Sequence, residues 1–252
     1  MNCLRNRLYL ATISDDAASL AREHRLGLEL DDFCTAANMD ADFDHWDTRT
    51  RSFLAHSDRF ILHAPFAELH PCAIDPLVRG IAIQRFRQAA KLCERYSIKR
   101  MVVHTGFVPN VYFPVWFVEQ SAMFFREFLS ECPADFRIMI ENVMDPDPQP
   151  IFDMVCAIGD ERAGICLDVG HANAVSKLPI QQWLRVLSPK LTHLHVHDND
   201  GSWDTHSIPG DGNLGFPGLF DDLFAAAPDA TITCECIDAA GCVRRLSEYG
   251  LL

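Results

Sequence analysis

The most constraining feature of this sequence is a repeated unit in which a short apolar run is followed by a polar residue, a loop and an amphipathic stretch. Eight such runs occur, each rich in Val, Ile, Leu or Thr, which is typical of buried parallel strands. They lie at 8–13, 27–33, 59–66, 99–107, 137–143, 164–171, 191–199 and 230–237. Helix-like segments lie between most of them, at 15–24, 79–97, 116–131, 150–158, 179–187 and 217–226. This alternation predicts a parallel sheet, and eight strands in 252 residues predict a closed (β/α)8 TIM barrel.

The composition agrees with a single α/β domain over residues 1–252. Apolar residues make up 48% of the chain and charged residues 23%, which excludes a disordered protein. A doubly wound open sheet is the alternative, but no glycine-rich turn follows the first strand to bind a dinucleotide.

No apolar run approaches the roughly 18 residues of a membrane helix. The ten cysteines are scattered and form no CxxC pair, so we expect buried free thiols and a cytoplasmic protein.

Metal-competent residues lie at the ends of six runs. They are His63, His104, Glu141, Asp168, Glu235 and, alternating along the seventh run, His193, His195 and His197. Alternation places the three histidines on one face of their strand. In a parallel barrel the carboxyl ends of the strands open onto one mouth, where active sites lie. Imidazoles and carboxylates that converge there form a ligand set for zinc or manganese, with magnesium or cobalt as further candidates.

A histidine or glutamate at one strand end is most often an ordinary hydrogen-bonded surface group. Six strands that end this way are hard to explain by chance. Several carboxylates buried together are also costly unless a cation compensates their charge. The sequence therefore predicts a centre for one to three divalent ions.

Two local motifs extend this prediction. Asp168 and His171 form a DxxH turn at the end of the sixth run, so both side chains can reach neighbouring points of one cavity. Asp204 and His206 follow the seventh run and precede the segment IPGDGNLGF. The glycines of that segment allow the loop to fold tightly over the mouth.

The ordered set LHAP, VVHTG, IENV, CLDVGHAN, HVHDNDG, DTHSIPGDGNLGF and CECI resembles the xylose isomerase-like TIM barrel superfamily over roughly residues 8–237. That superfamily includes sugar-phosphate isomerases and epimerases, and the endonuclease IV group of apurinic endonucleases. For the epimerase branch, the resemblance implies one divalent metal held by Glu141, Asp168, His195 and Glu235. It departs from the ketose 3-epimerases at Gly201, where those proteins carry a substrate-binding Arg.

The epimerase branch implies a metal-dependent isomerase or epimerase that acts on a sugar or sugar phosphate through an enediolate. Glu141 and Glu235 would remove and return the proton next to the carbonyl. The resemblance makes His171 a substrate-binding residue. Further groups expected to contact the carbohydrate substrate are His63, His104, Trp203, Phe66 and Phe107.

The endonuclease IV branch uses nine ligands for three zinc ions, and this chain has a candidate for each. The first ion would be held by His63, His104 and Glu141. Glu141 would bridge to the second ion, whose other ligands would be Asp168, His195 and Glu235. The third would be held by His171, Asp204 and His206.

Charge helps to weigh these alternatives. The net charge of −13 and the lack of a basic stripe speak against a nucleic-acid partner. A barrel that binds metal and a small molecule without catalysis is the third hypothesis, because fold does not fix function.

The last segment, 239–252, is short for a barrel helix. It predicts a truncated final helix that leaves the barrel partly open there. The apolar edge, a candidate homodimer contact, would consist of Leu246, Tyr249, Leu251 and Leu252.

Overall fold

The computed structural model describes residues 2–252, whose strands form one closed parallel barrel in chain order. The strands are β1 (Leu8–Ala11), β2 (Gly27–Leu30), β3 (Phe60–His63), β4 (Arg100–His104), β5 (Arg137–Glu141), β6 (Ala163–Asp168), β7 (Leu191–Val196) and β8 (Thr231–Cys234). Each strand pairs with the next, and β1 pairs with β8 to close the barrel. The predicted (β/α)8 fold is confirmed.

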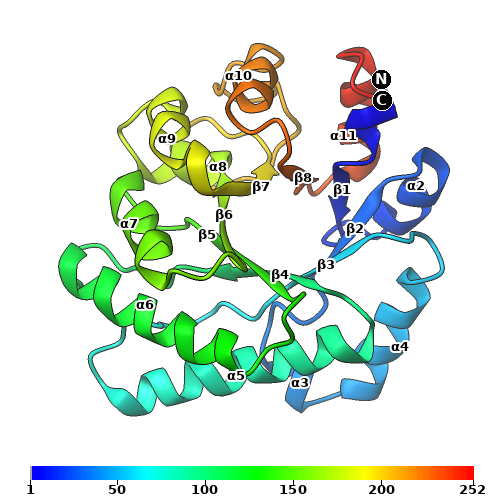
Figure 1. Ribbon diagram of the computed structural model, residues 1–252. Coiled ribbons are helices and arrows are strands. Elements are labelled where there is room, and N and C mark those ends of the chain that lie inside the picture. The colour runs from blue at the N-terminus through cyan, green and yellow to red at the C-terminus, as the bar shows by residue number, and fades with distance from the viewer. Residues whose placement is uncertain (1) are drawn as a thin grey trace.

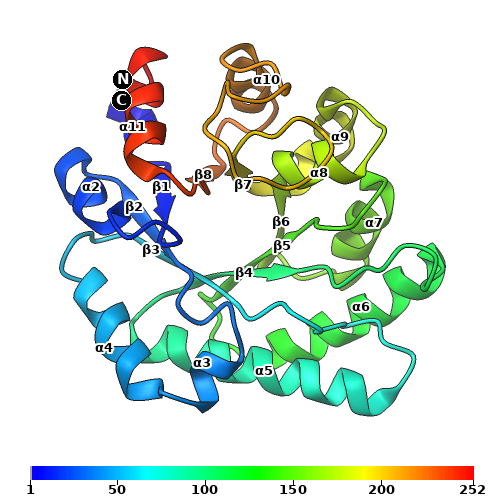
Figure 2. The ribbon, with the colours of Figure 1, turned by 180° about the vertical axis from the view of Figure 1, so that it is seen from behind.

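Helices surround the strands on the outside (Figure 1), and the view from behind shows the same arrangement (Figure 2). They are α1 (Asn2–Arg5), α2 (Ala17–His24), α3 (Ala37–Asp40), α4 (Phe43–Phe53), α5 (Pro76–Arg95), α6 (Pro114–Ser130), α7 (Pro148–Ile158), α8 (Val169–Val175), α9 (Ile180–Leu187), α10 (Gly218–Ala226) and α11 (Ala239–Glu248), with a 3-10 turn at Ser188–Lys190. The sequence did not predict α4. Its polar composition masks Phe43, Trp46 and Phe53, which pack against the core. No helix within residues 2–252 is long and apolar enough to cross a membrane.

Alternation along the strands separates two apolar layers. Residues that point outward, such as Leu10, Leu28 and Leu30, pack with the helices in one large core. Residues that point inward form a smaller cluster inside the barrel, made of Tyr9, Ile61, Val102, Met139 and Cys166. This inner cluster fills the barrel below its mouth, so the residues that follow it on each strand are presented on a packed support.

The expectation of an open edge at the C-terminus is wrong. The strands close fully, α11 packs against α2, and Leu246 has no exposed surface. Tyr249, Leu251 and Leu252 are half-buried and pack against the core. The last helix, α11, has ten residues, and α1 lies beside it in both views (Figures 1 and 2).

Candidate metal centre and active site

Strand register brings the predicted ligands together. Pairing of β4 with β5 sets His104 beside Glu141, and pairing of β6 with β7 sets Asp168 beside His195. Glu235 follows β8 directly and is buried. Ligand atoms of Glu141, Asp168, His195 and Glu235 all lie within 4.8 Å of one another. These four residues are called the quartet below.

Two polar atoms of the quartet have no hydrogen-bond partner among the described residues. They are Nδ1 of His195 and Oε1 of Glu141, and both are buried. The other ring nitrogen of His195, Nε2, lies 3.1 Å from Oε1 of Glu29 and donates to it. Nδ1 points toward the carboxylate oxygens of Glu235, at 3.1 Å, and Glu141, at 3.3 Å. One imidazole nitrogen directed at several buried carboxylate oxygens is a donor set that fits a divalent cation, which would take the place of the proton on Nδ1, so the quartet passes this chemical test as a metal site.

Neighbouring groups act differently on the pKa values of the two buried glutamates of the quartet. Burial alone would raise the pKa of Glu141, but His195, His104 and His171 hold that pKa well below its ordinary value. Glu235 has a raised pKa, because burial and the nearby charges of Glu141 and Glu29 outweigh the attraction of His195. The two carboxyl groups therefore differ in their readiness to hold a proton.

A second possible ligand group lies beside the quartet. His63 and His104 each place Nε2 3.3 Å from Oε2 of Glu141. Burial disfavours a charged His63, but the Glu141 carboxylate outweighs it and raises the pKa of His63 to about 9. Glu141 is shared, with one oxygen toward these histidines and the other toward the quartet. This is the set that the sequence assigned to a first ion.

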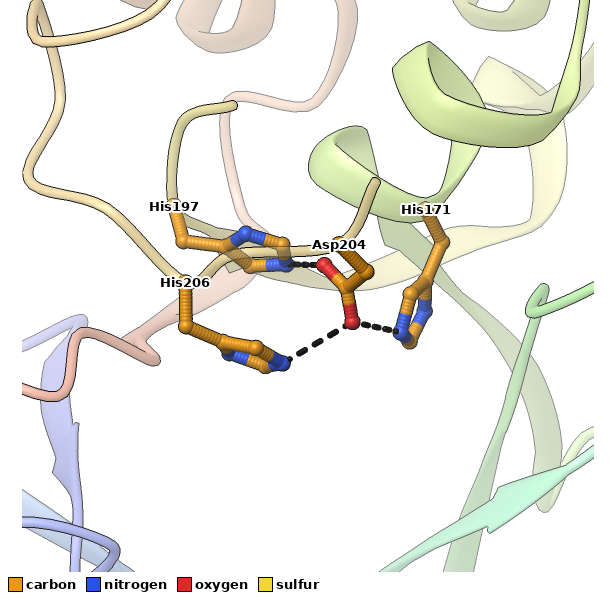
Figure 3. A group of neighbouring side chains, drawn as sticks. All are labelled: His171, His197, Asp204 and His206. Atoms are coloured by element: carbon orange, nitrogen blue, oxygen red, sulfur yellow. Dashed lines mark ion pairs between the residues drawn. The ribbon is translucent and has the colours of Figure 1, made fainter. Parts of the chain in front are cut away.

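A third possible ligand group consists of His171, His197, Asp204 and His206 (Figure 3). Asp204 Oδ2 lies 3.1 Å from Nε2 of His171 and 3.0 Å from Nε2 of His206, and Oδ1 lies 3.6 Å from Nε2 of His197. Burial would raise the pKa of Asp204, but His171 and His206 lower it strongly. The sequence named three of these residues as ligands. His197 was placed on the correct face but given no role.

The DVGH turn explains how this third group is built. Asp168 ends β6, and its side chain accepts a hydrogen bond from the backbone N–H of His171. Asp168 thus caps the N-terminus of α8. Gly170 is required because a Cβ there would lie 1.9 Å from Cε1 of His197. The glycine thus lets the His197 ring pass close to the turn and reach Asp168, at 3.1 Å.

Glu29 lies below the quartet and was not predicted as a site residue. Its carboxylate accepts from Nε2 of His195 at 3.1 Å, from Nε2 of His193 at 3.2 Å and from the hydroxyl of Thr233. Burial would raise the pKa of Glu29, but His195 and His193 hold it well below its ordinary value. A buried carboxylate that fixes the tautomer of a ligand histidine is a recurrent support of metal sites. The sequence signal that could have found it is alternation: Glu29 and Asp31 lie two residues apart in the second run, so both carboxylates face the same side of that strand.

The mouth opens into a cavity of about 520 Å³. It is lined by seven of the predicted site residues: His63, His104, Glu141, His171, Asp204, His206 and Glu235. Phe66 and Phe107 also line it, whereas Trp203 does not and is 76% exposed on the loop after β7. Asp31, which the sequence did not single out, lines the cavity as well, and burial raises its pKa to about 8.

A larger hollow, of about 650 Å³, lies between α5 and α6. Its charged groups neutralise one another, as Arg87 does with Glu131 and Lys99 with Asp135. None of the described metal-competent groups lies there. The chemistry is therefore placed at the barrel mouth.

Curated relatives align with part of the chain. The uncharacterized protein MJ1311 of Methanocaldococcus jannaschii is 28% identical over 189 residues, which cover 69% of this chain and 63% of that protein. The chain thus spans less than two thirds of this relative. Fructoselysine 3-epimerase of Escherichia coli O157:H7 is 36% identical over 59 residues, or 23% of this chain and 22% of that enzyme.

Solved structures share the fold over nearly the whole chain. A D-tagatose 3-epimerase-like protein superposes with a TM-score of 0.76 at 21% identity and covers 96% of both chains. A Thermus thermophilus protein, from a crystal soaked with ZnCl2, superposes with a TM-score of 0.74 at 23% identity and covers 96% of this chain and 97% of that one. The family model of the xylose isomerase-like TIM barrel matches residues 18–248. Together with the closed barrel and the possible metal ligands at its mouth, this match shows that the chain belongs to the xylose isomerase-like TIM barrel family.

Proposed function

We propose that this chain is a divalent-metal-dependent isomerase or epimerase that acts on a sugar or sugar phosphate through an enediolate. The observation that carries the proposal is the quartet, whose ligand atoms lie within 4.8 Å of one another beside a cavity of about 520 Å³. Zinc or manganese suits this mixture of one imidazole and three carboxylates. When bound, such an ion supplies a positive charge that stabilises the oxyanion of an enediolate.

Glu141 and Glu235 are the groups that would move the proton. They enter the site from β5 and β8, and both line the cavity. A substrate carbon between them would lose a proton to one carboxylate and regain it from the other. His171, which also lines the cavity, would orient a substrate hydroxyl.

The test is proton exchange with solvent. The chain loaded with Zn²⁺ or Mn²⁺ is incubated in D2O with a panel of aldoses and ketoses, and NMR follows deuterium at the carbon next to the carbonyl. We expect exchange and isomer formation with at least one sugar, both lost in Glu235→Gln. Absence of exchange across the panel with correctly loaded protein would contradict the proposal.

The second candidate is a zinc phosphodiesterase that acts on abasic DNA. It is favoured by the two further groups, His63–His104–Glu141 and His171–His197–Asp204–His206, which would allow three ions. Clustered zinc ions generate hydroxide and stabilise a leaving oxygen. Three bound ions per chain together with cleavage of an abasic oligonucleotide would favour this function. One tightly bound ion and no cleavage would favour the isomerase.

A further inference from the structure

The cavity at the mouth is lined by two chemically different sets of residues. One set consists of the possible metal ligands. The other set, called the apolar wall below, consists of apolar side chains from the loops after β1, β3, β4 and β5. This apolar wall consists of Ile13, Phe66, Leu69, Phe107, Val108, Val143 and Met144.

The apolar wall begins directly at the metal-binding groups. The ring of Phe66 stacks on that of His104, with centroids 4.5 Å apart, and meets His63 edge-on at 5.8 Å. Ile13, Phe66 and Met144 remain 40–50% exposed. Large apolar side chains that keep this much exposed surface around one cavity are typical of a ligand-binding site.

Away from the possible metal ligands, the cavity offers little to an anion. Among the described residues that line it, none is Lys or Arg. Its polar groups outside the ligand sets are Asp31, Glu68, His70 and Cys34, and His70 uses Nδ1 to bond the carbonyl of Gly106. A substrate phosphate at the end remote from the metal would therefore contact carboxyl groups and apolar side chains, with no cationic partner from Lys or Arg.

We propose that the substrate is an uncharged sugar whose end remote from the metal carries an apolar aryl or alkyl group. This inference rests on the proposed function, because the quartet defines which end of the substrate reacts. The apolar wall would then cover the remote group. Sugar phosphates, in which that end is a dianion, would bind weakly.

A matched series of ligands tests the inference. D-fructose, 6-deoxy-D-fructose, 6-O-benzyl-D-fructose and D-fructose 6-phosphate share the same reacting end. Calorimetry with the Mn²⁺-loaded full chain gives a dissociation constant for each. We expect the benzyl ether to bind at least about tenfold more tightly than D-fructose, and the 6-phosphate to bind most weakly.

Met144 provides the matching variants, because it lines the wall and makes no contact with a possible ligand that the structure records. Met144→Ala should reduce the preference for the benzyl ether, and Met144→Lys should strengthen binding of the 6-phosphate. Met123 on α6 is exposed to the same 50% outside the cavity, so Met123→Ala and Met123→Lys serve as controls that change neither.

The outcomes separate the inference from the function on which it rests. Equal affinities, or tightest binding of the 6-phosphate, would overturn the inference while an enzyme that exchanges protons stands. Unchanged preference in Met144→Ala would show that the wall does not contact the remote group. If no member of the series binds, the inference is overturned; the proposed function fails with it only if the whole panel of aldoses and ketoses also shows no proton exchange.

Discussion

Replacing Glu29 by Gln tests whether the layer below the quartet controls metal binding. The native carboxylate is fully buried and faces only donors: His195, His193 and Thr233. Gln keeps one acceptor oxygen but adds an amide with two N–H groups. Where that amide faces Nε2 of His195, the imidazole must move its proton to Nδ1. The lone pair directed at the quartet is then lost.

The expected size of this effect follows from the contacts. Loss of a supporting partner of a ligand histidine lowers metal affinity by about 10–100-fold, or about 1.4–2.8 kcal/mol. An amide N–H left buried without an acceptor also lowers the free energy of unfolding by about 1–3 kcal/mol. Glu29→Gln should therefore bind metal more weakly and melt at a lower temperature.

Competition with a chromophoric chelator measures Zn²⁺ affinity at pH 7, and thermal unfolding of the metal-free chain measures stability. Thr233→Val is the matched control, because it removes one donor to Glu29 and leaves the bond from His195 intact. It should lower stability and keep metal affinity near the native value. If Glu29→Gln binds Zn²⁺ as tightly as the native chain, or if Thr233→Val loses affinity equally, the positioning argument is refuted.

Three further predictions concern the quartet and its supports. Glu235→Gln should weaken metal binding and abolish proton exchange with little change in metal-free stability, because one clustered carboxylate charge is removed; a large drop in melting temperature would contradict this. Cys234→Ala should lower the free energy of unfolding by about 1 kcal/mol and preserve metal content, because Cys234 packs in the outer core beside α11; metal loss measured by emission spectroscopy would show that the strand register is wrong. Gly170→Ala should lower the free energy of unfolding by several kcal/mol, since its Cβ would overlap the ring of His197. Gly80→Ala in α5 is the control: its Cβ would meet nothing within 4 Å, and it should raise the free energy of unfolding by about 0.5–1 kcal/mol, which chemical denaturation of both variants measures.

Much of the barrel could be predicted because its signals are local and periodic. Seven of the eight observed strands lie within the predicted runs, and β6 begins one residue before its run. The helix α4 was missed because its buried residues are separated by polar ones. The C-terminal edge was misjudged because burial of Leu246 depends on α11 meeting α2, a contact between opposite ends of the chain.

The site shows a similar division. Residues at strand ends were recognised because parallel strands bring their ends to one mouth. Glu29 was not recognised. The alternation of side chains along its strand shows that Glu29 faces the barrel interior, but it does not show how deep the carboxylate lies or which groups it contacts. His197 was expected on the correct face, but its approach to Asp204 depends on the loop after β7 and on the space left by Gly170. Trp203 was expected at the substrate, yet its loop turns it outward, which no periodicity could indicate.

Ligand sharing has a consequence for how the three groups would fill. Glu141 belongs to two of them, and Asp168 of the quartet contacts His197 of the third at 3.1 Å. Binding at one position therefore changes the free energy of binding at its neighbour, and the coupling is reciprocal. A metal titration should not separate into three independent isotherms. For the same reason, substitution of a histidine in an outer group would alter the affinity of the quartet without touching it. A barrel of this design can thus change its metal stoichiometry by a few substitutions at the mouth while its fold stays the same.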